Sequence, residues 1–125
     1  EIAGDPVGVG IDHLPIGRIG EHVSVTQLLA RIATDRERRM TLKGPTATPR
    51  PDQVAQLFCT KEACAKAMGF GIGANLDWPQ LEVQSLARGE IAAVRFTGDG
   101  TRHLVAASNA VGGYGLAIAA SLGSG

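Results

Sequence analysis

The segment Phe58–Ala67 reads FCTKEACAKA, and its spacing of apolar residues predicts a helix at the centre of the fold. At about 100° of turn per residue, one side of this helix is apolar. That side is made of Val54, Leu57, Phe58, Cys64, Ala65 and Met68. Lys61 falls in the middle of it, where an unpaired ammonium is expensive. The segment therefore predicts a helix packed on a core, with a lysine that either extends to water or meets an anion.

The ends of this helix are marked by the residues around it. Asp52 is a good N-cap, and the helix should run to Met68, where Gly69 and the glycines after it stop the pattern. Before the helix, residues 41–51 form a predicted loop, because glycine and proline interrupt the sequence there. The interrupting residues are Gly44, Pro45, Pro49 and Pro51.

A strand is predicted at Val7–Asp12, which reads VGVGID. Its branched residues alternate with Gly8, Gly10 and Asp12, the period of two that is typical of a strand. A strand face of bare glycine usually lets another backbone or a ligand approach closely. Asp12 lies where this bare face ends.

In the rest of the chain, helical patterns come early and strand patterns come late. Ser24 and Gln27 form a predicted capping box at the start of a helix from about Ser24 to Arg38. The later period-two segments are Leu81–Leu86, Ile91–Thr97, His103–Ser108 and Gly115–Ser121. The turn GDG makes a hairpin of the second and third of these. The pattern predicts an α+β fold with helices packed on a small antiparallel sheet.

Length and charge limit the classes of function. The 125 residues suit a single domain, with residues 1–6 expected outside its core. Because 12 Lys and Arg balance 12 Asp and Glu, no overall field draws the chain to nucleic acid or to an anionic membrane. One local basic patch exists, for which a solvated helix end is the simpler explanation. It consists of Arg36, Arg38, Arg39 and Lys43.

Compartment is indicated by the cysteines and by the absence of targeting patterns. Cys59 and Cys64 lie roughly 140° apart around the predicted helix, a poor placement for a disulfide. No apolar run reaches the roughly 18 residues of a membrane span, and the first residues lack the layout of a signal peptide. We therefore expect a cytoplasmic protein. The chain starts at Glu1 without methionine, which leaves open a processed chain, a trimmed one or a domain excised from a larger synthase.

Candidate chemistry gathers on the predicted helix. Glu62 and Lys66 are four residues apart, so their simplest interpretation is an exposed ion pair worth about 0.2–0.5 kcal/mol. Together with Lys61, they also suit an anionic ligand held partly through a divalent cation, because ammonium groups donate to phosphate and carboxylates bind magnesium. Asp12 is the candidate for a second carboxylate.

These residues carry a family resemblance. The strand GVGID, Arg18 six residues after its aspartate, and the helix pattern F-x-x-K-E-A-x-x-K-A-x-G resemble the holo-acyl-carrier-protein synthase group of 4′-phosphopantetheinyl transferases. The resemblance extends from Val7 to about Ser121. It implies that family's α+β fold and transfer of the phosphopantetheine arm of coenzyme A to a serine of an apo acyl carrier protein, with release of adenosine 3′,5′-bisphosphate.

The resemblance also implies roles for individual residues. Asp12 and Glu62 would bind Mg²⁺ with the pyrophosphate of coenzyme A, and they form the catalytic group with Lys66. Arg18 would meet acidic residues of the carrier protein. The positions expected to contact or adjoin coenzyme A are Lys61, Lys66, Gly69, Gly71 and His103. Small members of the family are homotrimers with active sites between subunits, and we expect the same here.

Some positions depart from the family pattern and keep a second interpretation open. Leu57 stands where the family often has arginine, and Val105–Ala107 replaces a stretch rich in serine and threonine. The alternative is a catalytically degenerate trimeric domain that binds a carrier protein or coenzyme A without transfer. An unrelated phosphate-binding protein with a chance motif is a third. Retention of the polar group Asp12, Glu62 and Lys66 favours the enzyme, and His13 is interpreted as structural.

Overall fold

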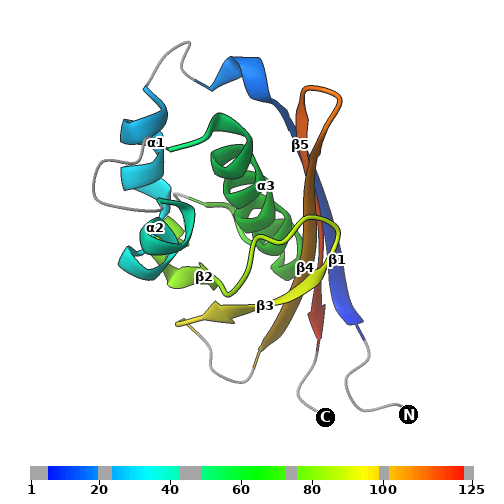
Figure 1. Cartoon of the computed structure of the whole chain (residues 1–125). Helices are drawn as coiled ribbons and strands as arrows, with labels where there is room; N and C mark the ends of the chain where they lie inside the picture. Colours follow the sequence, from blue (N-terminus) through cyan, green and yellow to red (C-terminus); the bar gives the residue numbers. More distant parts are fainter. Residues whose placement is uncertain (1–5, 20–23, 43–48, 73–75, 99–101, 123–125) are drawn as a thin grey trace.

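The computed structural model describes residues 6–19, 24–42, 49–72, 76–98 and 102–122. These residues form a five-stranded antiparallel sheet in the order β1-β5-β4-β3-β2, with the helices on one face (Figure 1). The strands are β1 Pro6–Pro15, β2 Leu81–Val83, β3 Ile91–Phe96, β4 His103–Val111 and β5 Tyr114–Leu122. The helices are α1 Val25–Ile32, α2 Asp35–Thr41 and α3 Pro51–Met68, with short 3₁₀ turns η1 Ile16–Arg18 and η2 Trp78–Gln80. The predicted α+β class is confirmed.

Helix α3 lies between the sheet and the layer of α1 and α2 (Figure 1). It approaches β1 so closely that a Cβ atom on Gly8 would lie 2.0 Å from the carbonyl oxygen of Ala67. A Cβ atom on Gly10 would lie 2.0 Å from the carbonyl oxygen of Ala63. Only glycine fits at this distance, so the predicted close approach of another backbone to the bare strand face is confirmed.

The helix predicted from Ser24 to Arg38 is wrong, because two helices occupy this region. Thr34 begins the second with a capping box of its own: its Oγ1 accepts from Glu37 N at 3.2 Å, and Glu37 Oε1 accepts from Thr34 N at 2.8 Å. The box stops α1 at Ile32 and starts α2 at Asp35. Of the basic patch, Arg36 and Arg39 are exposed on α2, while Lys43 lies outside the described residues.

The start of α3 also differs from the prediction. Arg50 is the N-cap residue and makes no side-chain capping bond, while Asp52 lies in the first turn. Pro51 explains the shift, since proline suits the first helical position, where its missing N–H would have no partner inside the helix. The predicted end is confirmed: Gly69 caps the helix with a left-handed φ of 79°. Residues 43–48 of the predicted loop lie outside the described residues.

The late strands follow the predicted order. β3 and β4 form the predicted hairpin, in which Ile91 is paired with Ala107 and Val94 with Leu104. β2 ends at Val83, short of the predicted Leu86. Just beyond it, Gln84 N still donates to Ala93 O of β3 at 3.1 Å, whereas Leu86 O accepts a hydrogen bond from Gln56 of α3 at 3.1 Å.

The two faces of the sheet differ sharply. The inner face and α3 share a core that includes Leu29, Ile32, Val54, Leu57, Leu81, Val94 and Leu104. No described element covers the outer face. Seven large apolar side chains on it are between 38% and 78% exposed. They are Val9, Ile11, Ile91, Val111, Tyr114, Leu116 and Ile118. None of the described helices is long and apolar enough to cross a membrane.

Candidate active site

Asp12 and Lys66 meet where β1 crosses α3. Asp12 continues the glycine face of β1 toward the helix, and its carboxylate Oδ1 accepts a hydrogen bond from Lys66 Nζ at 2.9 Å. The same ammonium donates to the backbone oxygen of Ile11 at 3.1 Å. The side chain of Asp12 is 15% exposed and that of Lys66 is 50% exposed. The structure thus brings together two of the predicted site residues, from a strand and a helix distant in sequence.

Glu62 lies one turn before Lys66 on α3 and is half-buried. Burial raises the pKa of Glu62, and the negative charge of Asp12 raises it further, while Lys66 opposes the shift. The pKa of Lys66 is raised as well, chiefly by its hydrogen bond to Asp12. These effects join Asp12, Glu62 and Lys66 in one electrostatic group of two carboxyl groups and one ammonium.

The oxygen donors of this group fit a hard divalent cation. The carboxylates of Asp12 and Glu62 are both hard oxygen donors, and the negative charge of Asp12 that raises the pKa of Glu62 would be offset by a cation placed near both. In the described part of the chain, no cluster of three or more His, Cys, Asp or Glu side chains could hold a metal by itself. A cation here would complete its coordination with water or ligand oxygens, which is the way Mg²⁺ is usually bound at phosphate sites.

Cys59 belongs to this site and was missed from the sequence. Its Sγ donates to the backbone oxygen of Gly115 at 3.4 Å. Burial is the main cause that raises its pKa to about 12, and interactions with Asp12 add to this. The signal was the spacing: Cys59, Glu62 and Lys66 follow the i, i+3, i+7 rule and share a side of α3. The thiol of Cys59 therefore stays protonated and uncharged near neutral pH, beside the carboxyl groups of Asp12 and Glu62.

Lys61 is not part of this group. Its Nζ lies 2.6 Å from Glu37 Oε1, and both side chains are fully buried. The ammonium also donates to the backbone oxygens of Ile32 and of Trp78, the latter at 3.0 Å. The predicted anionic partner thus exists, but it is a glutamate of α2, and the structure does not place Lys61 beside Asp12. Glu37 was missed because its sequence signal, the box with Thr34, indicates only a helix start.

The structure also places the other residues that were predicted to contact coenzyme A or the carrier protein. Gly69 and Gly71 are exposed just beyond the end of α3, and Arg18 is exposed on η1. His103 is aligned with Leu122, whereas the level of Asp12 on β4 is Ser108, five residues along the strand. At about 3.4 Å per residue, His103 is roughly 17 Å away along the sheet. Within one chain the structure does not bring His103 to the other site residues.

Two further residues named from the sequence are placed clearly. His13 is exposed on the outer face, 6.2 Å between ring centroids from Tyr114 in an edge-on contact. It points away from the side on which Asp12 meets α3. Leu57 is fully buried in the core, so this position in the chain serves packing.

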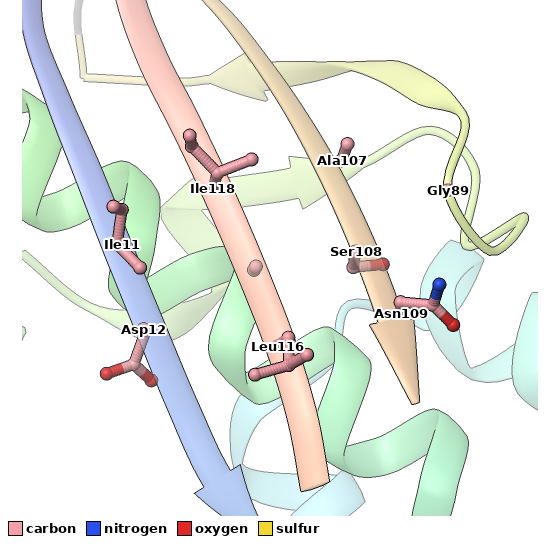
Figure 2. Close-up of a pocket in the computed structure, with 9 residues that line it drawn as sticks. Ile11, Asp12, Gly89, Ala107, Ser108, Asn109, Leu116 and Ile118 are labelled. Atoms are coloured by element: carbon pink, nitrogen blue, oxygen red, sulfur yellow. The ribbon is translucent and has the colours of Figure 1, made fainter. Parts of the chain in front are cut away.

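A shallow apolar hollow of about 330 Å³ crosses the outer face at the level of Asp12 (Figure 2). It extends over β1, β5 and β4 to the turn at Gly89, with α3 behind the sheet. Its lining includes Ile11, Ala107, Leu116 and Ile118. The polar group of Asp12 therefore borders an apolar surface that the chain itself leaves open.

Known proteins share both the sequence and the fold. The family model described as the 4′-phosphopantetheinyl transferase superfamily matches residues 8–119. The holo-[acyl-carrier-protein] synthase of Bacillus mycoides is 38% identical over 87 residues, covering 67% of this chain and 71% of that protein. The protein of the same name from Methylorubrum populi is 34% identical over 104 residues, covering 78% of this chain and 71% of its own.

A solved structure agrees with these matches. A holo-(acyl-carrier-protein) synthase from Bacillus anthracis, crystallised in complex with CoA (3′,5′-ADP), superimposes with a TM-score of 0.75 and 27% sequence identity. The match covers 95% of this chain and 98% of that one. The family prediction made from the GVGID strand and the FCTKEACAKA helix is confirmed, and with it the class of enzyme. The chain belongs to the 4′-phosphopantetheinyl transferase superfamily.

Proposed function

We propose that this chain transfers the 4′-phosphopantetheine group of coenzyme A to a serine of an apo acyl carrier protein. The observation that carries the proposal is the Asp12–Lys66 contact of 2.9 Å, with the carboxylate of Glu62 one helical turn away. Two carboxylates and an ammonium in one half-open site suit a phosphate-bearing substrate with a bound cation. The relatives named holo-[acyl-carrier-protein] synthase support the same substrate class.

In this proposal Asp12 and Glu62 hold Mg²⁺, which supplies charge neutralisation of the pyrophosphate of coenzyme A. Lys66 orients Asp12 and donates its remaining N–H to a phosphate oxygen. The serine hydroxyl of the carrier gives its proton to water, its oxygen forms a new bond to the phosphorus next to the pantetheine arm, and the phosphoanhydride bond breaks. Adenosine 3′,5′-bisphosphate leaves. Because such a transfer needs little covalent work from the protein, positioning and charge are what these residues contribute.

We further propose a homotrimer in which active sites lie between subunits. The support is the uncovered outer face, whose Ile91 is 78% exposed and whose apolar hollow borders Asp12. Contact with a second copy would bury this surface and could supply residues such as His103 to the site of a neighbour. The proposed location is the cytoplasm, where thiols such as Cys59 and Cys64 remain reduced.

The transfer is tested by incubating the chain with coenzyme A, MgCl₂ and an apo acyl carrier protein, followed by intact mass spectrometry of the carrier. The expected result is a gain of one phosphopantetheine group that requires both Mg²⁺ and the carrier serine. A control carrier with that serine replaced by alanine should gain nothing. Binding of the carrier or coenzyme A without any mass gain would instead favour a domain that has kept the fold and lost the reaction.

A further inference from the structure

A fully buried ion pair lies on the side of α3 that faces away from the sheet. Lys61 of α3 and Glu37 of α2 are each 0% exposed, and their Nζ and Oε1 atoms are 2.6 Å apart. Burial lowers the pKa of Lys61, and the charge of Glu37 opposes this. The reaction proposed above uses neither residue.

Apart from the bond to Thr34 at the cap of α2, the donors and acceptors of this pair have partners on other elements. Glu37 Oε2 accepts from Val83 N of β2 at 2.6 Å, and Oε1 accepts from Thr34 N at 2.8 Å. Lys61 donates to Ile32 O at the end of α1 and to Trp78 O of η2. Among the described residues no buried side-chain N or O atom lacks a partner. Two charges thus join α1, α2, α3, η2 and β2 at one point.

A pair of this kind is poorly explained as a source of stability. Burying two charges costs several kcal/mol per ion, and apolar residues of similar volume often give equal or better stability. What a satisfied buried pair supplies is geometry, because its bonds permit few alternative arrangements. The geometry that this pair can fix is the rotation of α3 about its own axis.

Three consecutive residues, Lys61, Glu62 and Ala63, connect this rotation to the candidate site. Lys61 attaches α3 to the outer helical layer, and Ala63 presses its carbonyl oxygen against Gly10 of β1, where a Cβ would lie 2.0 Å away. Glu62 lies between these two contacts. Since successive residues are about 100° apart, any roll of α3 about its axis moves Glu62 toward or away from Asp12, two residues beyond Gly10.

We propose that Glu37 and Lys61 are positioning residues that fix the rotation of α3 and so hold Glu62 at its working distance from Asp12. The inference rests on the proposed function, in which these two carboxylates bind a divalent cation. Lys61 acts through the helix and touches neither substrate nor metal. This gives the lysine of the KEA segment a role that differs from that of Lys66, although both lie on the same helix.

The test is Mn²⁺ binding by the whole chain, measured by electron paramagnetic resonance well below the melting temperature. The variant Glu37→Gln/Lys61→Met removes both charges and keeps an acceptor oxygen for Val83 N or Thr34 N. We expect it to fold and to bind Mn²⁺ about tenfold or more weakly than the natural chain, as for residues that orient metal ligands. If the double variant does not fold, Glu37→Gln alone is measured, with the same expected direction.

Two controls separate the possible failures. Leu104→Ala weakens the core in β4 without touching the pair, and it should bind Mn²⁺ like the natural chain. If Leu104→Ala loses as much affinity as the pair variant, or if a folded pair variant binds Mn²⁺ normally, the positioning role is wrong. Asp12→Asn tests the proposed function itself: if Mn²⁺ does not bind the natural chain, or binds Asp12→Asn equally well, the metal site fails and the positioning role falls with it.

Discussion

Lys66 Nζ donates at once to the carboxylate of Asp12, at 2.9 Å, and to the backbone oxygen of Ile11, at 3.1 Å. One ammonium group therefore binds both a side chain and the main chain of β1 at the site. The contact orients Asp12 before any ligand arrives. It also leaves Lys66 with a third N–H that can face an anion.

Replacing this lysine should separate catalysis from stability. Lys66→Ala removes the proposed charge-assisted bond to a phosphate oxygen of coenzyme A, whose typical worth of about 1.5–3 kcal/mol corresponds to a loss of roughly 10- to 100-fold in kcat/KM for coenzyme A. The free energy of unfolding should change by less than about 1 kcal/mol, because Lys66 is 50% exposed. Steady-state kinetics and urea unfolding measure the two quantities. Arg39→Ala, which removes an exposed cation from α2, should leave both almost unchanged.

The contact of β1 with α3 predicts a sharp difference between two glycines. Gly10→Ala would place a Cβ 2.0 Å from Ala63 O, so the strand and helix must separate at a cost of about 1–3 kcal/mol or more. Gly17→Ala has no atom within 4 Å of its added Cβ and should be nearly neutral. Urea unfolding of both variants checks this. Equal stabilities would show that β1 and α3 do not pack as closely as described.

The buried thiols predict a loss of stability at alkaline pH. The pKa values of Cys59 and Cys64 are raised from 9.0 to about 12 in the folded chain. Above pH 9 the unfolded thiols lose their protons while the folded ones keep them, so the free energy of unfolding should fall as pH rises from about 9 to 12. The slope is about 1.4 kcal/mol per pH unit for each thiol. Urea unfolding at pH 8 to 11 measures it, and Cys59→Ala should halve this component.

The uncovered outer face predicts the effect of one charge on assembly. Ile118 lies on β5 in the middle of this face, and it is 50% exposed. Ile118→Asp should therefore leave the fold of a single chain intact, and the added charge should prevent association of this apolar surface. Sedimentation velocity should show a trimer for the natural chain and a monomer for the variant. Thr26→Asp, on the exposed side of α1, should remain trimeric. A natural chain that is monomeric at micromolar concentration would contradict the proposed assembly.

Arg18 predicts how the carrier protein docks. Because the chain as a whole is neutral, attraction to an acidic carrier must be local, and Arg18 is exposed on η1 close after β1. Arg18→Glu should raise the KM for the carrier about tenfold at low ionic strength, and less at high salt, where charges are screened. The KM for coenzyme A should stay the same. An unchanged carrier KM at low salt, or equal damage to both KM values, would show that Arg18 does not dock the carrier.

Local patterns predicted the parts of the fold that depend on near neighbours. The alternation of VGVGID gave the glycine face of β1, and the helical spacing of FCTKEACAKA placed Glu62 and Lys66 on one side of α3. Contacts between distant segments were harder. The buried pairing of Glu37 with Lys61 depends on how α2 and α3 pack, and the capping box that Glu37 forms with Thr34 indicates a helix start but no buried partner.

The break between α1 and α2 shows a different limit. Thr34 and Glu37 match the capping-box pattern as well as Ser24 and Gln27 do. No glycine or proline interrupts residues 24–39, so the sequence carries no strong helix breaker at Ile32. The local hydrogen bonds of the second capping box are what end α1 and begin α2. His103 shows the third case, since its partners would come from another subunit if the trimer forms.

The position of β1 at the edge of the sheet determines when the site can form during synthesis of the chain. Among the described strands β1 pairs with β5, so Asp12, near the start of the chain, is aligned with Ala117, near the end. During synthesis from the N-terminus, α3 emerges before β5 and can pack on the glycines of β1, but β5, the hydrogen-bonded partner of β1, is made after every other described strand. A nascent chain would therefore carry Asp12 on a strand that lacks its β5 partner until β5 leaves the ribosome, and competence for catalysis would arrive with β5.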